Sequence, residues 1–207
     1  MWRFSHIERR EPDRALERSG ELVAIAEPLG FPLFVGMGRF LRGCARVDLG
    51  ESETGIVEMQ QALVELAQIG SGVGAPGFLT LFADCLRKVG RYDEALGVVG
   101  LGLARAEGQG AHWADPELHR LHAQILLDRG DAAEEAEARL GQALEIARRL
   151  ENRLHGLRVV MGLARLWQGQ GKRDQARALL APVHAWFTEG FDLRDLNDAK
   201  ALLAELA

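Results

Sequence analysis

The sequence predicts an all-α protein, a right-handed superhelical solenoid of antiparallel helix pairs that ends in a capping helix. Three observations support this prediction. Ala, Leu, Glu and Arg, which favour helices, are frequent, whereas runs of β-branched residues are scarce. Glycines recur at an interval of about 40 residues, each between two helical patterns. Small residues recur at a constant position before these glycines, as expected where two helices pack closely.

The repeat is marked by Gly50, Gly90, Gly130 and Gly171, which lie 40, 40 and 41 residues apart. Each glycine ends one helical pattern shortly before another begins, so we expect a turn at each of the four positions. A small residue lies seven positions before each glycine, where it would let the two helices of a pair approach each other. These small residues are Gly43, Ala83, Ala123 and Ala164.

The segment around Gly90 carries the most complete copy of the pattern. It has Ala83 at the eighth position of the repeat, Gly90 at the fifteenth, Tyr92 at the seventeenth and Ala95 at the twentieth. This arrangement resembles the tetratricopeptide repeat. The period is ambiguous, because the standard repeat has about 34 residues and HEAT or armadillo units have about 40–47. The small-residue pattern favours the tetratricopeptide interpretation, with longer helices or longer loops between repeats.

The repeat divides one domain, residues 1–207, into six segments with about ten helices in total. The segments are a partial repeat at 1–30, helix pairs at 31–70, 71–110, 111–150 and 151–190, and a capping helix at 191–207. The last segment carries Leu196, Ala199, Leu203 and Leu206 on one stripe, with a polar opposite face. Such a helix suits the end of a solenoid, where the outer face meets water.

The N-terminal segment offers an apolar edge that has no predicted neighbour. Trp2, Phe4 and Ile7 lie on its outer side. Exposed apolar edges tend to find partners, so we expect self-association through residues 1–30. A chain that begins with half a repeat is also expected to be a fragment of a longer protein or the product of a truncated gene. The second helix of the segment has an apolar stripe of Ala15, Leu22, Ile25 and Ala26, and part of this stripe should pack on the first pair.

The helix predicted from Tyr92 to Glu107 contains three glycines, Gly97, Gly100 and Gly102. Glycine inside a helix costs about 0.8–1 kcal/mol relative to alanine. Two explanations stay open: close packing that excludes a side chain, or a helix that is locally soft.

Several segments resemble one bacterial family. They are Leu180–Asp192, Asp195–Leu203, Trp113 with Glu117–Leu121, Arg165–Trp167 and Arg10–Pro12. The segments resemble the C-terminal tetratricopeptide region of multidomain proteins that join a class III adenylate/guanylate cyclase domain, or a DNA-binding regulator, to a STAND-type ATPase. The resemblance implies a cytoplasmic protein-interaction or scaffold module in a larger signalling protein. It also implies that any nucleotide chemistry belongs to upstream domains, so that this chain is no enzyme and needs no cofactor.

Charge and composition argue against several classes of partner. The formal net charge of −5 disfavours nucleic acid, because neutralising phosphates needs clustered Lys and Arg. The longest uncharged stretch, residues 66–83, is interrupted by glycines and a proline, so we expect no membrane-spanning helix. The two cysteines, Cys44 and Cys85, are expected to be reduced, small buried residues of a cytoplasmic protein.

No group of side chains predicts catalysis or metal binding. The loop Gly72–Gly77 lacks the Lys-Ser or Lys-Thr pair with which a P-loop binds phosphate and Mg²⁺. His112, His119 and His122 cluster in the third pair, but their spacing matches no recognised ligand motif. Neither cysteine has a histidine within a plausible helical step. We therefore expect no catalytic residue and no metal ligand.

In tetratricopeptide arrays the first helix of each pair lines a concave groove. That register predicts ten inward-facing residues: Phe40, Cys44, Thr80, Asp84, Arg87, Arg120, Gln124, Met161, Arg165 and Gln168. Such a groove suits a peptide with an acidic portion, or an inward-folded segment of the parent protein. Two alternatives stay open, a sensor that holds a small effector and a wet surface that binds nothing. An enclosed apolar pocket would favour the effector, and an open groove would favour a protein.

Two arginines of this set, Arg120 and Arg165, are expected on neighbouring inner helices. A planar guanidinium can make bidentate contacts to a carboxylate of a partner. Because neither residue belongs to the predicted helix seam, we expect both to be dispensable for folding.

Overall fold

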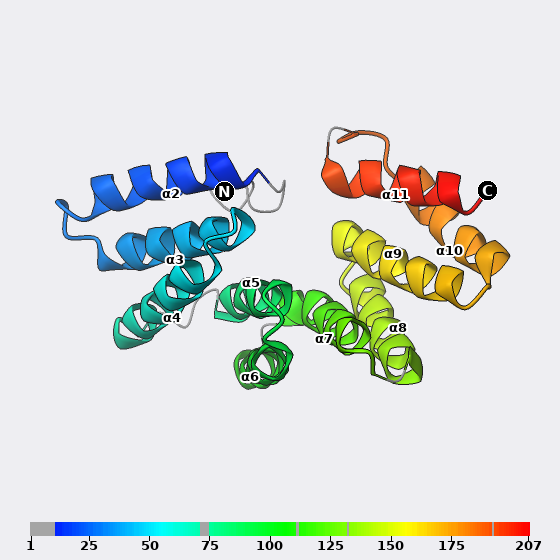
Figure 1. Ribbon diagram of the computed structural model, residues 1–207, viewed down its shortest axis with the longest axis horizontal. Coiled ribbons are helices and arrows are strands. Elements are labelled where there is room, and N and C mark those ends of the chain that lie inside the picture. The colour runs from blue at the N-terminus through cyan, green and yellow to red at the C-terminus, as the bar shows by residue number, and fades with distance from the viewer. Residues whose placement is uncertain (1–10, 71–74, 111, 132, 192) are drawn as a thin grey trace. The chain divides into compact units, whose positions relative to one another are not determined.

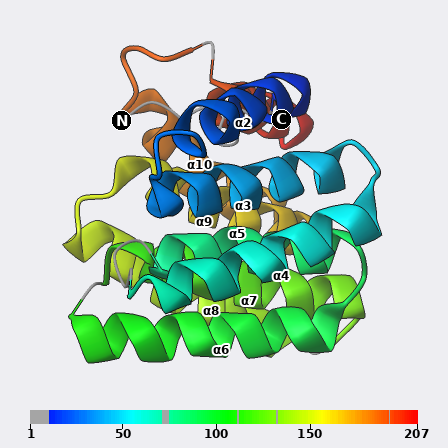
Figure 2. The same cartoon turned by 90° about the vertical axis from the view of Figure 1, so that its left-hand side faces the viewer.

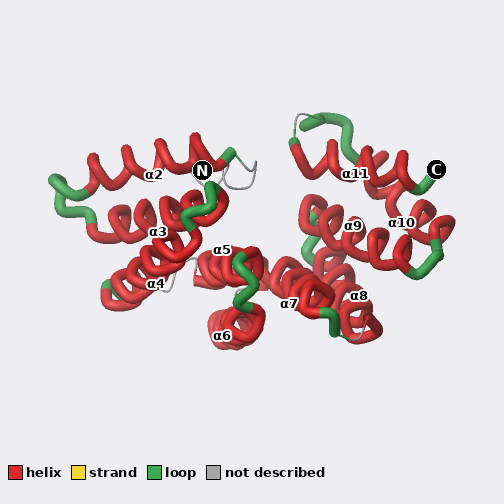
Figure 3. Tube along the Cα trace, in the orientation of Figure 1, coloured by secondary structure: helices red, strands yellow, loops and turns green. Residues whose placement is uncertain are grey.

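The computed structural model describes residues 11–70, 75–110, 112–131, 133–191 and 193–207. In these ranges the chain forms ten α-helices and one short 3₁₀ helix, and it forms no strand (Figure 1, Figure 3). The prediction of an all-α solenoid of antiparallel helix pairs is therefore confirmed. None of the described helices is both long enough and apolar enough to cross a membrane.

The chain falls into two compact units, Met1–Val98 and Val99–Ala207, whose division lies inside one helix, α6. The first unit contains α2 (Pro12–Ala26), α3 (Pro32–Asp48), α4 (Ser52–Gln68), α5 (Ala75–Lys88) and the start of α6 (Tyr92–Gln109). The second contains the rest of α6, η1 (His112–Ala114), α7 (Asp115–Arg129), α8 (Ala133–Arg149), α9 (Arg153–Gly169), α10 (Arg173–Ala185) and α11 (Arg194–Glu205). α11 is the predicted capping helix. The single domain over residues 1–207 stays a prediction.

Five of the described helices, α2, α3, α5, α7 and α9, end in glycine turns of one kind. In each turn the glycine has a φ between +67° and +93°, a left-handed conformation that favours glycine. Its N–H bonds the carbonyl three residues back, and the next N–H reaches the carbonyl five residues back; at Gly130 these distances are 3.1 and 2.9 Å. The turns predicted at the four repeat glycines are confirmed, and one at Gly30 adds to them. The residues of this kind are Gly30, Gly50, Gly90, Gly130 and Gly171.

The turn after α8 has a glutamate in the position that glycine takes elsewhere. Glu151 has a φ of +52° and is the one non-glycine residue in the described ranges with a positive φ. It keeps both hydrogen bonds of the glycine turns, from its own N–H to Arg148 (3.1 Å) and from Asn152 N–H to Ala147 (2.9 Å). A side chain in this conformation brings Cβ too close to the following carbonyl oxygen. The turn between α8 and α9 is therefore locally strained.

Replacing Glu151 by glycine should raise the free energy of unfolding of the second unit by about 0.5–1 kcal/mol, since relief of the left-handed strain outweighs the flexibility that glycine adds to the unfolded chain. Urea denaturation followed by circular dichroism measures the change. Glu151→Ala is the matched control, because it removes the carboxylate and keeps the strained Cβ. Equal stability of the two variants would show that the strain is absent.

In the first unit α3 packs against α2, α4 and α5 (Figure 2). It crosses α4 at two glycines. A Cβ built on Gly43 would lie 2.7 Å from the carbonyl oxygen of Gly55, and one built on Gly55 would lie 2.5 Å from the carbonyl oxygen of Gly43. Real Cβ atoms do not approach backbone oxygens so closely. The predicted role of Gly43 at a helix seam is confirmed, and Gly55 is a second such position that the repeat pattern did not reveal.

α2 packs on α3 with part of the predicted stripe and with one residue outside it. Ala15, Leu22 and Ala26 are buried as expected, but Ile25 is exposed and Val23 is buried in its place. The reason is a close approach of α3, since a Cβ on its Gly38 would lie 2.7 Å from Cγ2 of Val23. The prediction for Trp2, Phe4 and Ile7 lies outside the described residues, and self-association through 1–30 stays a prediction.

The three glycines of α6 have different surroundings. A Cβ on Gly97 or Gly100 would meet no atom within 4 Å, whereas one on Gly102 would lie 2.9 Å from Cδ2 of Leu118. Close packing therefore accounts for Gly102 alone. Gly97 and Gly100 lower the helix propensity of α6 without a packing reason.

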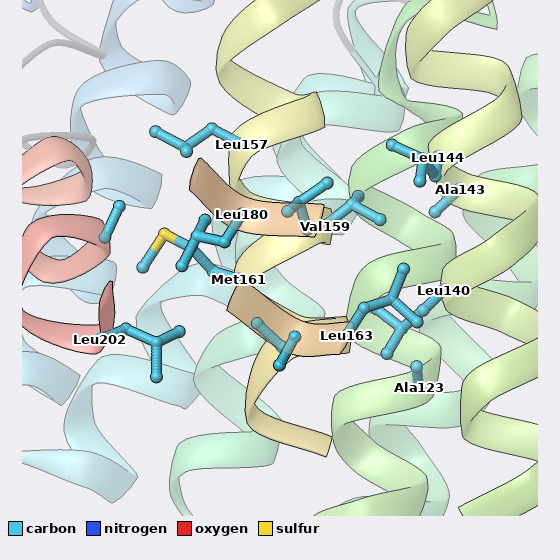
Figure 4. Packing of buried hydrophobic residues seen from close by; sticks show 14 of the residues in the cluster. Ala123, Leu140, Ala143, Leu144, Leu157, Val159, Met161, Leu163, Leu180 and Leu202 are labelled. Atoms are coloured by element: carbon cyan, nitrogen blue, oxygen red, sulfur yellow. The ribbon is translucent and has the colours of Figure 1, made fainter. Parts of the chain in front are cut away.

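In the second unit α9 contacts all four of its neighbours, α7, α8, α10 and α11. Its buried side chains meet residues of these helices in one hydrophobic core (Figure 4). Since α9 packs directly on both α7 and α11, the first helices of the pairs form one layer and the second helices, α8 and α10, form the other. Core residues that represent the five helices are Leu126, Leu140, Leu157, Leu163, Leu180 and Leu202.

Candidate functional site

Three of the predicted groove residues of the first unit are buried. The rings of Phe40 and Phe78 meet edge to face with their centroids 4.9 Å apart, and the thiol of Cys85 donates to Sγ of Cys44 at 3.5 Å. This hydrogen bond and burial raise the pKa of Cys85. Thr80 donates to a carbonyl of its own helix at 2.8 Å. Phe40, Cys44 and Thr80 therefore belong to the packing of α3 on α5, and they do not line an open groove.

The other two residues, Asp84 and Arg87, lie in a cluster of charges at the edge between α3 and α5. Asp84 Oδ1 accepts from Nε of Arg87 at 3.0 Å, and its Oδ2 lies 3.1 Å from Nζ of Lys88. Lys88 also donates to Asp48 of α3 at 2.6 Å. Burial opposes the charge of Lys88, but the two carboxylates outweigh it and raise its pKa. Asp84 and Arg87 are thus half-buried residues with partners inside the first unit.

The second unit contains five of the predicted groove residues. Three of them, Gln124, Arg165 and Gln168, are accessible, Met161 is not, and Arg120 is described below. Met161 is buried in the core, because α9 packs on α11 at that position. Gln124 is half-buried and donates to Asp128 at 2.8 Å, and Gln168 is also half-buried. Arg165 is exposed, and it forms no ion pair with any residue in the part of the second unit that the structure describes.

Arg120, the remaining predicted groove residue, belongs to a partly buried charge network. Two of its nitrogens donate to the carboxylate of Glu117 at 2.9 and 2.8 Å, and the two side chains are 19% and 13% exposed. On α9, Arg158 donates to Asp195 of α11 at 2.8 Å. Burial alone would raise the pKa of Glu117, but Arg120 and Arg158 outweigh it and lower the pKa to about 2. Arg120 therefore has an ion-pair partner inside the second unit and does not present a free guanidinium, while its dispensability for folding stays a prediction.

The histidines of the third pair do not form a metal site in the described ranges, where no three potential ligands come together. Nδ1 of His112 lies 2.8 Å from Oδ2 of Asp115. Two buried atoms nearby, Oδ1 of Asp115 and Nδ1 of His119, have no hydrogen-bond partner among the described residues. Burial lowers the pKa of His119 and of His122, which favours their neutral forms.

A hollow that the sequence analysis did not predict lies between α3 and α4. It is open to solvent and has a volume of about 650 Å³. Arg39, Arg42 and Arg46 line it from α3, and their spacing of three and four residues places them one helical turn apart on one edge. We call it the arginine hollow. Its lining from α4 comprises Glu53, Thr54, Val57, Glu58 and Gln61.

Glu58 holds two of these arginines in place. Its Oε1 accepts from Nε of Arg42 at 2.6 Å and its Oε2 accepts from Nη1 of Arg46 at 2.8 Å. The spacing of the arginines is visible in the sequence. What could not be read there is that Glu58 of the next helix lies between two of them, because this depends on the close crossing at the two glycines.

Comparisons with known proteins bear on the fold. No protein-family model and no curated protein matches the chain. Among solved structures, the crystal structure of BtubC (BKLC) from P. vanneervenii is similar to it, with a TM-score of 0.73 and 20% sequence identity. The similarity covers 94% of this chain and 82% of the BtubC chain. At this identity it shows a shared helical fold alone.

Proposed function

We propose that this chain is a protein-interaction scaffold of the tetratricopeptide type, the regulatory C-terminal region of a larger cytoplasmic signalling protein in bacteria. The resemblance to cyclase-linked and ATPase-linked proteins supports the parentage. The observation that carries the binding role is the accessible surface of α7 and α9. Arg165 is exposed there without an ion pair in the described second unit, and Gln124 and Gln168 remain half-exposed.

The chemistry of this surface fits a protein segment. Gln124 and Arg165 occupy equivalent repeat positions, one residue after Ala123 and Ala164, on helices that contact each other. Amide side chains can both donate and accept, so they suit a peptide backbone, while the guanidinium suits a carboxylate. A small effector would instead need an enclosed apolar pocket. The hollow between α3 and α4 of the first unit is open and lined by charges, so it does not offer such a pocket.

Photo-crosslinking in a lysate of the organism that encodes the chain tests the proposal. A photoreactive amino acid in place of Gln168 should form a protein adduct of defined mass. Arg177, which is exposed on the second helix α10, is the matched position that should form none. Arg165→Glu should reduce the Gln168 adduct by at least about tenfold, since it places like charge against an acidic partner.

The melting temperature of Arg165→Glu should stay unchanged, because exposed substitutions rarely shift stability by more than about 0.5 kcal/mol. If position 168 gives no adduct beyond that at position 177, the surface of α7 and α9 does not bind protein. The scaffold role would then lose its support.

A further inference from the structure

We propose that Cys44 and Cys85 are a site of reversible oxidative modification, at which a peroxide converts the two thiols into a disulfide that links α3 to α5. The inference does not depend on the proposed role in protein binding, because it concerns the interior of the first unit. It starts from the contact between the two sulfurs, in which the thiol of Cys85 donates to Sγ of Cys44 at 3.5 Å. The chain contains no other cysteine, so this is the one disulfide that it can form within itself.

Contacts on either side of the cysteines keep α3 and α5 in register. One helical turn before the cysteine of α3, the rings of Phe40 and Phe78 meet edge to face with their centroids 4.9 Å apart. One turn after it, Nζ of Lys88 donates to Asp48 at 2.6 Å. The three residues of α3 are spaced four apart, so they lie on one face and their contacts follow one another turn by turn. The two sulfurs therefore meet whenever α3 packs on α5.

The position of Cys44 is also fixed from the side of α4. Gly43, the residue before it, lies at the close crossing with α4, where an added Cβ would lie 2.7 Å from the carbonyl oxygen of Gly55. A disulfide needs the sulfurs about 2 Å apart, so they have to approach by about 1.5 Å. Rotation about the two Cα–Cβ bonds can supply this movement while the helices stay in place.

The oxidation proceeds in two steps whose atoms and electrons balance. The thiolate of one cysteine attacks an oxygen of hydrogen peroxide, so that an S–O bond forms, the O–O bond breaks and hydroxide leaves. The thiolate of the other cysteine attacks the resulting sulfenic sulfur, so that the S–S bond forms, the S–O bond breaks and a second hydroxide leaves. The two thiols lose two electrons and two protons in total, and the peroxide is reduced to two water molecules.

The folded protein keeps the pair reduced until the contact between α3 and α5 opens. Both cysteines are buried, and the hydrogen bond to Cys44 together with burial raises the pKa of Cys85. Because the thiolate is the nucleophile, the closed pair reacts slowly. Opening of the contact admits water and peroxide, and closing it again brings the sulfurs together. The disulfide thus forms when the first unit opens under oxidising conditions.

Once formed, the disulfide stabilises the first unit. It joins residues that are 41 positions apart, and the loop that it closes contains the whole of α4. A link of this kind restricts the unfolded chain far more than the folded one, in which the two side chains already touch. The modification therefore locks α3 to α5, and a thiol reductant releases the lock by thiol–disulfide exchange.

Treatment of the full chain with hydrogen peroxide, followed by denaturation, alkylation and peptide mass spectrometry, tests the inference. The peptides that carry Cys44 and Cys85 should be recovered as one linked species, two hydrogens lighter than their sum, and dithiothreitol should separate them. The melting temperature of the oxidised chain should exceed that of the reduced chain by at least about 5 °C. Urea below the unfolding transition should speed the loss of alkylatable thiol at least about tenfold, since it favours the open form.

Cys44→Ala is the matched control, because it keeps a small apolar side chain and removes one partner of the disulfide. The same peroxide treatment should not raise its melting temperature. Each protein is compared with its own untreated sample, so a lower starting stability of the variant does not affect the result.

Two alkylatable thiols after peroxide treatment in urea would overturn the proposal, as would sulfinic acids or a covalent dimer in place of the linked peptides. A linked pair that leaves the melting temperature unchanged would overturn the lock. An equal rise in Cys44→Ala would overturn it too, because the rise would then come from oxidation elsewhere in the chain.

Discussion

Replacing Gly55 by alanine is expected to lower the free energy of unfolding of the first unit by about 3 kcal/mol, because the added methyl group overpacks a helix crossing. The new Cβ would lie 2.5 Å from the carbonyl oxygen of Gly43 and 3.0 Å from the backbone nitrogen of Val47. Both are backbone atoms, so no side-chain rotation relieves the clash. α3 and α4 would have to move apart, and the arginine hollow between them would change shape.

Gly97→Ala is the matched control in the same unit. A Cβ there meets open space, so this variant should gain the usual helix propensity of alanine, about 0.8–1 kcal/mol. Urea denaturation of both proteins, followed by circular dichroism, gives the two changes with opposite signs. A Gly55→Ala protein as stable as Gly97→Ala would contradict the close crossing of α3 and α4.

The second large effect is expected from Arg120→Glu, which should destabilise the second unit by about 3–5 kcal/mol. Replacing Arg120 removes the two hydrogen bonds and the nearest counter-charge of Glu117, which keeps only weaker electrostatic interactions such as that with Arg158, and the substitution also adds a like charge. The side chain of Glu117 is only 13% exposed, so water can solvate its charge only in part. Arg165→Glu, at an exposed position of α9, is the control and should change stability by less than about 0.5 kcal/mol. Equal melting temperatures for the two variants would show that Arg120 is dispensable.

The same network makes stability depend on pH. The pKa of Glu117 is lowered from an ordinary 4.5 to about 2, so the folded state binds its proton less readily than the unfolded state. Its contribution is fully present above about pH 4.5 and is lost as the pH falls toward 2. At about 1.4 kcal/mol per pH unit, this contribution amounts to about 3 kcal/mol. The urea midpoint should therefore fall further between pH 7 and pH 3 in the unaltered chain than in Glu117→Gln, which lacks the carboxylate. Equal falls in the two proteins would contradict the lowered pKa of Glu117.

The helices and their turns could be read from the chain because they depend on local interactions. A left-handed turn needs glycine at one position whatever surrounds it, so Gly50, Gly90, Gly130 and Gly171 located four helix ends. The apolar stripe of the last segment likewise located α11, since a helix repeats its face every 3.6 residues, about two positions in seven. The exception at Glu151 shows the limit of this reasoning, because nothing local marks a glutamate as a left-handed residue.

The accessible surfaces could not be read in the same way, because they depend on how closely neighbouring helices approach. Phe40, Cys44 and Met161 have the repeat positions of groove residues, yet tight packing between first helices buries them. Arg120 has the same repeat position as Met161, but it forms an ion pair with Glu117 of its own helix, close to Arg158 of α9. The arginine hollow arises where two glycines let α3 and α4 cross. Each outcome depends on contacts between helices, which the order of residues within one helix does not contain.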